Sequence, residues 1–245
     1  MKFVFIVTAF NAAEWCKRNL ESIFSQTYNK YRVIYVDDCS TDNTTSLISE
    51  YKIQLIKNKT RCYQTYNRWI AYHLCDDDEI CIMLDGDDWL VDEYVLDYLN
   101  FIYHENDILC TYGQFKLFYQ GFQKEVYATR SYPEEIKNES TYRSYDFIAY
   151  HLRTGYAGLF KKIPSEYLMY KGQWLDRCSD VAEMLCVLEL SGNKNMNSGK
   201  TLYTYNKNNS MKYSNSPFLD KTRQEYEKHV RQLKPLRSEK NVSFN

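Results

Sequence analysis

This sequence contains little proline and little glycine, and its net charge is close to zero. Its 245 residues include only 4 prolines and 8 glycines, and the formal net charge is −1. We find no internal repeat and no low-complexity linker. Because the charges nearly balance, no global field would recruit nucleic acid or an anionic membrane, although residues 221–240 are locally basic. Nucleic acid is therefore not an expected partner.

Long apolar runs are also missing. No stretch approaches the roughly 20 apolar residues that a membrane-spanning helix needs, so we expect no transmembrane span. Met1 and Lys2 followed by the apolar residues 3–7 imitate the start of a secretory signal, but that run is at the short limit for such a signal. We interpret it as a buried first strand.

The cysteines form no C-x-x-C pair and show no metal-ligand spacing. Several lie inside apolar patterns, which is typical of reduced, buried thiols. This usage predicts a soluble protein in a reducing compartment, the cytoplasm. The eight positions are Cys16, Cys39, Cys62, Cys75, Cys81, Cys110, Cys178 and Cys186.

The first half of the chain alternates apolar strands with helical patterns. With 44% hydrophobic residues the chain can bury one large α/β core. Asn11 with Glu14 three residues later forms a capping box that predicts the first helix. Continuous apolar strands separated by helices predict a parallel sheet covered on both faces. The expected strands are 3–8, 33–36, 53–56 and 80–84, and helices are expected after Asn11 and at 44–51, 62–74 and 91–103.

The second half is less regular. Two strands are predicted around a turn at Gln120 and Gly121, and a basic amphipathic helix is predicted near the C-terminus, where copies of the chain could associate. The tail from residue 238 is expected to fray. The expected strands are 108–119, 124–129 and 202–205, and the expected helices are 145–152, 181–190 and 217–234.

Polar clusters follow three of the predicted strands, at residues 8–11, 37–42 and 85–88. In a parallel α/β sheet, ligands bind beyond the carboxyl ends of the strands, so these clusters should be neighbours. Carboxylates at one point repel each other, and a hard divalent cation with oxygen ligands removes that cost. Together the clusters outline a site for a nucleoside diphosphate with a cation. The alternative is that they are only helix caps and first-turn residues.

These segments also resemble the ordered motifs of family 2 glycosyltransferases, which have the Rossmann-like GT-A fold. The resemblance covers residues 1–110 well and continues weakly to about 210. It implies a nucleotide-sugar-binding half at 1–110, an acceptor-binding and catalytic-base half at 111–212, and a C-terminal helix and tail at 213–245. The motifs are VTAFNAAE at 7–14, SIFSQT at 22–27, VDDCSTD at 36–42 and LDGDD at 84–88.

The resemblance implies inverting, metal-assisted transfer of a hexose or N-acetylhexosamine from a UDP-sugar to a hydroxyl of a glycan or protein-linked acceptor. By motif position, Asp38 reads the uracil or ribose, Arg61 and Asn67 approach the donor, and Asp88 with Asp87 binds Mn²⁺ or Mg²⁺. Arg61 could pair with a phosphate or be a solvated cation. The implied donor contacts are Thr8, Ala9, Phe10, Asn11, Asp38, Arg61, Asn67, Asp85 and Asp87.

The catalytic base implied by the resemblance is Asp180. It begins a predicted helix at a position where this family places its base, although Ser179 departs from the commoner preceding residue. Its alternative role is a first-turn Asp favoured by the helix dipole, and Glu183 is a second candidate base. The Tyr-x-x-His pattern that adds a metal ligand in many members is missing, so Asn208 or water is expected to substitute, or Lys207 is expected to contact a phosphate.

Acceptor recognition is expected from aromatic and glycine-rich segments of the second half. The two candidate segments are residues 155–160, which end on Phe160, and residues 172–174, which end on Trp174. Aromatic faces of this kind stack against sugar rings, and the alternative is that they belong to the core.

Other functions remain open from the residues alone. A non-catalytic sugar-nucleotide or glycan-binding protein would share the scaffold. An Asp-dependent phosphatase would use Asp85 as nucleophile and Asp87 as acid/base, but its motif belongs near the start of the chain. A dinucleotide oxidoreductase is disfavoured because no G-x-G-x-x-G follows any strand.

Overall fold

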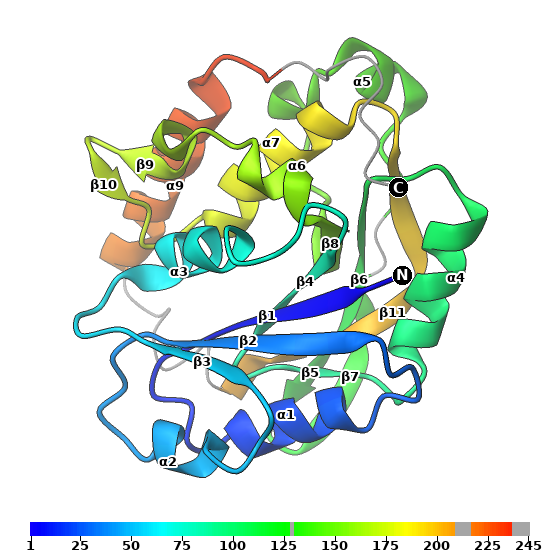
Figure 1. The fold of residues 1–245 in the computed structure, drawn as a ribbon. Coiled ribbons are helices and arrows are strands. Elements are labelled where there is room, and N and C mark those ends of the chain that lie inside the picture. Colours follow the sequence, from blue (N-terminus) through cyan, green and yellow to red (C-terminus); the bar gives the residue numbers. More distant parts are fainter. Residues whose placement is uncertain (128–129, 209–216, 237–245) are drawn as a thin grey trace.

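A single large sheet organises the molecule. The computed structural model describes residues 1–127, 130–208 and 217–236. Within this part of the chain, nine strands run in the order β3-β2-β1-β4-β8-β6-β11-β5, and β7 pairs with β6 (Figure 1). They are β1 (Phe3–Ala9), β2 (Tyr31–Asp37), β3 (Gln54–Lys57), β4 (Ile80–Asp85), β5 (Trp89–Leu90), β6 (Cys110–Tyr119), β7 (Phe122–Tyr127), β8 (Tyr150–Tyr156) and β11 (Asn195–Asn206). A separate hairpin joins β9 (Met169–Tyr170) to β10 (Gln173–Trp174).

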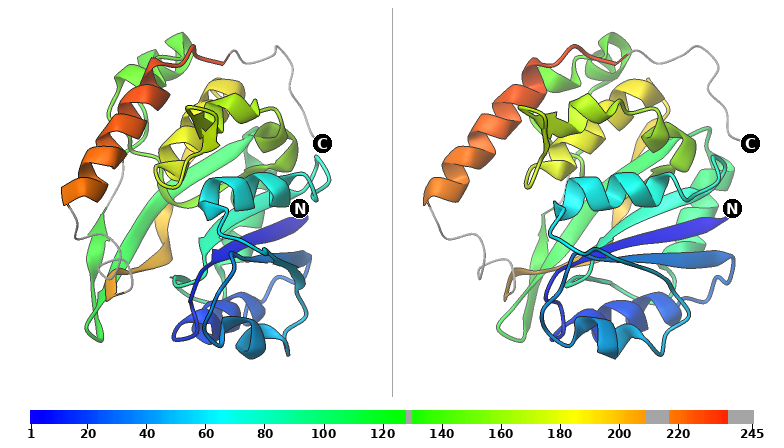
Figure 2. Two further views of the ribbon diagram at one scale, coloured as in Figure 1. Left: turned by 90° about the vertical axis from the view of Figure 1, so that its left-hand side faces the viewer. Right: turned by 60° about the vertical axis from the view of Figure 1, so that its left-hand side comes forward.

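The helices cover both faces of this sheet. Figure 2 shows α1 and α2 on one side, α3, α6 and α7 on the other, and α9 outside α7. A layer on each face explains why all seven residues of β1 are buried. The helices are α1 (Cys16–Phe24), α2 (Thr44–Ile48), α3 (Tyr63–Tyr72), α4 (Val95–Glu105), α5 (Glu134–Glu139), α6 (Ala157–Lys161), α7 (Ser179–Ser191) and α9 (Pro217–Gln232), with 3₁₀ turns η1 (Tyr142–Ser144) and η2 (Ser165–Leu168).

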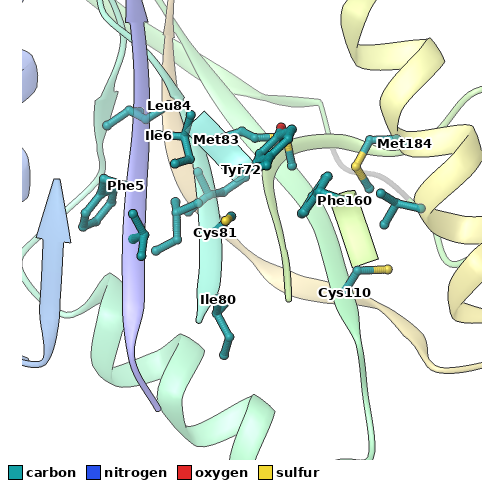
Figure 3. Close-up of a cluster of buried hydrophobic side chains, with 14 of the residues drawn as sticks. Phe5, Ile6, Tyr72, Ile80, Cys81, Met83, Leu84, Cys110, Phe160 and Met184 are labelled. Atoms are coloured by element: carbon teal, nitrogen blue, oxygen red, sulfur yellow. The ribbon is translucent and has the colours of Figure 1, made fainter. Parts of the chain in front are cut away.

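One continuous core of buried side chains joins the sheet to the helices on both faces. Figure 3 shows Tyr72 of α3, Phe160 of α6 and Met184 of α7 facing β4 and β6. The rings of Tyr72 and Phe160 stack with centroids 4.4 Å apart. Phe160 is fully buried and offers no surface to an acceptor, so the alternative that it belongs to the core is confirmed.

The predicted parallel strands are confirmed in β1, β2, β3 and β4, which pair parallel to each other. The predicted helix at 145–152 is wrong, because the chain enters β8 at Tyr150. β8 runs antiparallel between β4 and β6. Its pairing partners lie about 40 to 75 residues away in sequence, so a local pattern could not reveal the strand.

The register brings the polar clusters to one edge of the sheet. Thr8 pairs with Asp85, and Ala9 pairs with Asp37. Gly86 lets the acidic loop pack on β1, because a Cβ at this position would lie 2.5 Å from the Ala9 Cβ. The expectation that these clusters are neighbours is therefore confirmed.

The capping box is not formed. α1 begins at Cys16, and the preceding Trp15 makes no side-chain capping bond. Asn11 instead has a φ of +50°, and its Oδ1 accepts a hydrogen bond from Thr41 N at 2.8 Å. Its side chain therefore joins the loops after β1 and β2.

Two global expectations can be compared with the described residues. None of their helices is both long and apolar enough to cross a membrane. All eight cysteines are free, and six are buried, while Cys39 and Cys62 are partly exposed.

Candidate active site

A cavity of about 500 Å³ opens at the carboxyl ends of β1, β2 and β4. Seven residues of the predicted donor and metal set line it, contributed by these strand ends and by the segment leading into α3. Four further lining residues were not predicted. The predicted group is Thr8, Ala9, Phe10, Asp38, Arg61, Asn67 and Asp87, and the others are Tyr63, Gln64, Asp176 and Arg177.

Asp38 is held by several contacts at this cavity. Its oxygens accept hydrogen bonds from Asn58 Nδ2 at 2.9 Å and from the backbone N–H groups of Cys62 and Tyr63 at 2.8 and 3.0 Å. Arg61 Nε lies 3.0 Å from the same carboxylate. These contacts therefore tie the start of α3 to the end of β2.

Arg61 and Phe10 form one wall of the cavity. The guanidinium carbon lies 3.4 Å from the centre of the Phe10 ring, which is cation–π contact. Because Arg61 also pairs with Asp38, the structure favours a fixed wall residue over a freely solvated cation.

The loop residues 40–44 have a structural role. Ser40 Oγ accepts a hydrogen bond from Asn11 N at 2.9 Å, and Thr44 Oγ1 accepts one from Ala12 N at 2.8 Å. Asn11 does not line the cavity, so its side chain supports the loop behind Phe10.

The three aspartates of the LDGDD motif lie in different environments. Asp87 lines the cavity, whereas Asp85 Oδ1 pairs with Arg68 Nη2 at 2.7 Å. Asp88 is only 1% exposed, and its two oxygens accept hydrogen bonds from the Tyr203 hydroxyl and from Asn206 N. Burial raises the pKa of Asp88 well above its usual value, and the charges of Asp87 and Asp85 raise it further.

These residues fit a cation that is shared with substrate phosphates. They do not form a complete set of protein ligands around it. Among the described residues, no group of three or more His, Cys, Asp or Glu side chains is arranged to hold a metal ion. Mg²⁺ is commonly held by one or two carboxylates together with substrate phosphates. A cation next to Asp87 would also offset the repulsion that raises the pKa of Asp88.

Asp180 lies in the first turn of α7 and lines a second hollow of about 420 Å³. Its Oδ2 is 3.5 Å from Nη2 of the buried Arg153, and the same nitrogen lies 3.1 Å from His151 Nε2. His151 stacks on Tyr203 at 4.2 Å, and Tyr203 donates to Asp88. A buried chain of contacts therefore joins Asp180 to the acidic loop.

His151 is a neutral link in this chain. Burial lowers its pKa well below the usual value, and the charges of Arg153 and Arg68 lower it further. Since Arg153 can only donate, Nε2 accepts the hydrogen bond and the ring proton is assigned to Nδ1. His151 packs on Tyr203 and does not line the cavity.

The other candidate residues lie outside the cavity. Glu183 is completely buried beside Arg68 and Tyr72. Trp174 packs against Tyr66 and Trp69, and Asn208 Oδ1 accepts from Gln120 N at the β6–β7 turn.

Sequence reasoning missed Tyr63 and Gln64 of α3 and the segment before α7. Gln64, Asn67 and Arg68 share a face of α3 at spacings of three and four, so Asn67 could have indicated Gln64. Asp176 and Arg177 had no local signal, because only the tertiary structure brings them to the cavity.

Replacing Asp88 with alanine should destabilise the fold. Asp88→Ala leaves the buried Tyr203 hydroxyl and Asn206 N–H without their acceptors, and we expect a loss of about 2–4 kcal/mol in the free energy of unfolding. Urea denaturation measures it. The exposed Asp107→Ala is the control, with an expected change below about 0.5 kcal/mol. Equal destabilisation by both variants would contradict the buried role of Asp88.

The comparison with known sequences agrees with this site. Residues 4–168 match the model of the family described as Glycosyl transferase family 2. The chain is 30% identical over 118 residues to the poly(ribitol-phosphate) beta-N-acetylglucosaminyltransferase TarS of Staphylococcus aureus. That alignment covers 44% of this chain and 20% of TarS, so the matched part spans about a fifth of the relative.

Solved structures show the same fold. TarS 1–349 in complex with UDP-GlcNAc superposes with a TM-score of 0.62 at 20% identity, covering 84% of this chain and 59% of that one. The Pyrobaculum calidifontis mannosyltransferase PcManGT in complex with GDP-Man and Mn²⁺ gives 0.55 at 13% identity, covering 94% and 69%. These neighbours are GT-A glycosyltransferases. With the GT-A sheet, the acidic loop at its carboxyl edge and the family match over 4–168, the chain belongs to glycosyl transferase family 2.

Proposed function

We propose that this protein is an inverting glycosyltransferase that moves a hexose or N-acetylhexosamine from a UDP-sugar to an acceptor hydroxyl. The observation that carries the proposal is the convergence of Phe10, Asp38, Arg61 and Asp87 on one cavity at the carboxyl edge of the sheet. Unrelated helix caps have no reason to converge in this way. Because TarS is named for N-acetylglucosamine transfer, UDP-GlcNAc is the first donor to test.

Residues of the donor half, 1–110, would recognise the UDP-sugar. Thr8, Ala9 and Phe10 would face the uracil, with Asp38 beside its imide N–H or the ribose. Arg61 and Arg177 place two guanidinium groups at the cavity, where each could pair with a diphosphate oxygen. Asn67 and Asp87 would contact the ribose and sugar.

The base half supplies proton transfer. Asp180 would accept the proton of the acceptor hydroxyl while that oxygen bonds to the anomeric carbon. The bond from this carbon to the diphosphate oxygen breaks, UDP leaves with the electron pair, and the configuration inverts. Asp180 then releases its proton to solvent. Arg153 Nη2, which lies 3.5 Å from Asp180 Oδ2, would hold this carboxylate in place.

Asp87, together with Asp88 from the buried side, would hold Mn²⁺ or Mg²⁺ against the diphosphate. When bound, the cation supplies Lewis-acid stabilisation of the charge on the leaving diphosphate. Asp85 is engaged by Arg68, so its role would be to support the loop that presents Asp87.

The proposal also covers acceptor binding, self-association and the cellular compartment. Residues 111–212 would bind a glycan or a glycosylated acceptor around the hollow at Asp180, with residues 1–110 as the donor half. Residues 213–245, which include α9, would mediate any self-association. Eight free thiols favour a reducing compartment such as the cytoplasm.

Screening sugar nucleotides tests this function directly. With Mn²⁺ present, a cognate UDP-sugar at 100 times its dissociation constant should add about 2.7 kcal/mol to the free energy of unfolding. Thermal unfolding and detection of UDP release measure binding and turnover, and chelation of the cation should abolish both gains.

The outcomes separate the candidate functions. Binding without UDP release across a panel of acceptors would favour the non-catalytic alternative. Phosphate release from a simple phosphate ester, with no sugar-nucleotide turnover, would favour the phosphatase.

A further inference from the structure

Two side chains of α3 link the acidic loop to the first turn of α7. Asp85 Oδ1 accepts hydrogen bonds from both Arg68 Nη2 and Gln64 Nε2. The other end of each side chain reaches α7. Gln64 Oε1 accepts from Ser179 Oγ at 2.7 Å, and Arg68 Nη1 donates to Glu183 Oε2 at 3.2 Å.

The contacts on α7 flank the proposed base on both sides. Ser179 precedes Asp180 directly, and Glu183 follows it by about one helical turn. The Tyr72 hydroxyl also donates to Glu183 Oε2 at 3.3 Å. Fixing two points so close to Asp180 limits both rotation and sliding of this turn relative to β4.

The Arg68–Glu183 half of this bridge is buried, which makes it costly to break. Arg68 is 1% exposed and Glu183 is 0% exposed. Burial raises the pKa of Glu183 to about 7, because Arg68, which it shares with Asp85, offsets only part of the cost of burying the charge. Removing one partner of a buried pair is strongly unfavourable. Glu183 has no access to solvent, so it is suited to positioning rather than to proton transfer.

We propose that Gln64 and Arg68 are positioning residues that hold the α7 turn carrying Asp180 in register with the acidic end of β4. This inference rests on the proposed function for its catalytic consequence. Misplacement of a reacting group by about 1 Å can lower the rate roughly 10²-fold. Removing the α7 partners of the bridge should therefore affect kcat, while donor binding should change little, because Ser179 and Glu183 do not line the cavity.

α7 itself offers a matched control. Glu189 lies farther along the same helix and pairs with Arg143 through bonds of 2.6 and 2.8 Å, and both side chains are buried. This second buried pair lies away from the cavity. Glu189→Gln therefore reports the purely structural cost of breaking a buried ion pair on α7.

The experiment compares Ser179→Ala, Glu183→Gln and the double variant with Glu189→Gln. Steady-state transfer gives kcat and KM, UDP titration with Mn²⁺ gives donor affinity, and hydrogen exchange follows the amides of residues 182–184. We expect the double variant to lose about 10–100-fold in kcat with UDP affinity within about 3-fold of the parent. Exchange at residues 182–184 should accelerate, whereas Glu189→Gln should change neither kcat nor this exchange.

Failure of the inference and failure of the proposed function give different results. If the parent turns over a UDP-sugar and the double variant keeps its kcat, or if Glu189→Gln loses as much, the positioning role is wrong. If the parent shows no transfer with any donor, the proposed function fails. In that case unchanged exchange at residues 182–184 would still overturn the bridge, and selective acceleration would support it.

Discussion

Asp180→Asn should reduce the transfer rate by about 10²–10⁴-fold, the range that a positioned general base contributes. Asparagine keeps the shape of the side chain but cannot accept the acceptor proton. Because Asp180 lies outside the donor cavity, UDP affinity should remain unchanged. Single-turnover transfer, with UDP titration in parallel, measures both effects.

The control for this prediction addresses the helix dipole. Asp97 is the first-turn acidic residue of α4, so Asp97→Asn removes the same kind of helix charge far from the proposed base. This control should retain the parental rate. Parental activity of folded Asp180→Asn, or equal losses in both variants, would refute the assignment of the base.

Asp87→Asn should weaken cation-dependent donor binding by roughly 10–100-fold. A charged contact of this kind is worth about 1.5–3 kcal/mol, which converts to that range of affinity. Asp87 lines the cavity, so its charge faces the position proposed for the cation and the diphosphate. Calorimetric titration of UDP with and without Mn²⁺ measures the change, which should vanish without the cation.

Two variants make this result specific. Asp92→Asn is the control, because Asp92 is exposed five residues farther along, where its Oδ1 accepts from Tyr94 N at 2.9 Å. It should bind UDP as the parent does. If Asp87→Asn keeps cation-dependent binding while a folded Asp88→Asn loses it, the cation belongs to Asp88 alone.

Local sequence was sufficient to place the strand ends that line the cavity. Each of β1, β2 and β4 contains a continuous apolar run, and Asp38 and Asp87 lie within two residues of a strand end. Parallel pairing then brings the strand ends to one edge, so the position along the chain predicts the position in space. The same reasoning placed Thr8 and Phe10 at the cavity.

Local sequence was insufficient for β8 and for the detailed environment of the acidic loop. The backbone groups of β8 form hydrogen bonds with β4 and β6. The pattern of residues 145–152 does not predict those partners. The position of Asp88 in the sequence did not show that its oxygens accept hydrogen bonds from Asn206 and Tyr203, more than 110 residues away. Such contacts depend on how the helices and strands pack together, and they produce no periodic pattern in the sequence.

The amino-acid sequence by itself determined the strand–helix alternation, the family and the edge of the sheet at which polar residues gather, because these follow from local periodicity and chain order. Only the tertiary structure decided which carboxylates face the cavity and how α3 ties β4 to the helix that carries Asp180. Arg68 and Glu183 are separated by 115 residues. Their pairing arises from burial against a shared core, which no stretch of sequence encodes alone.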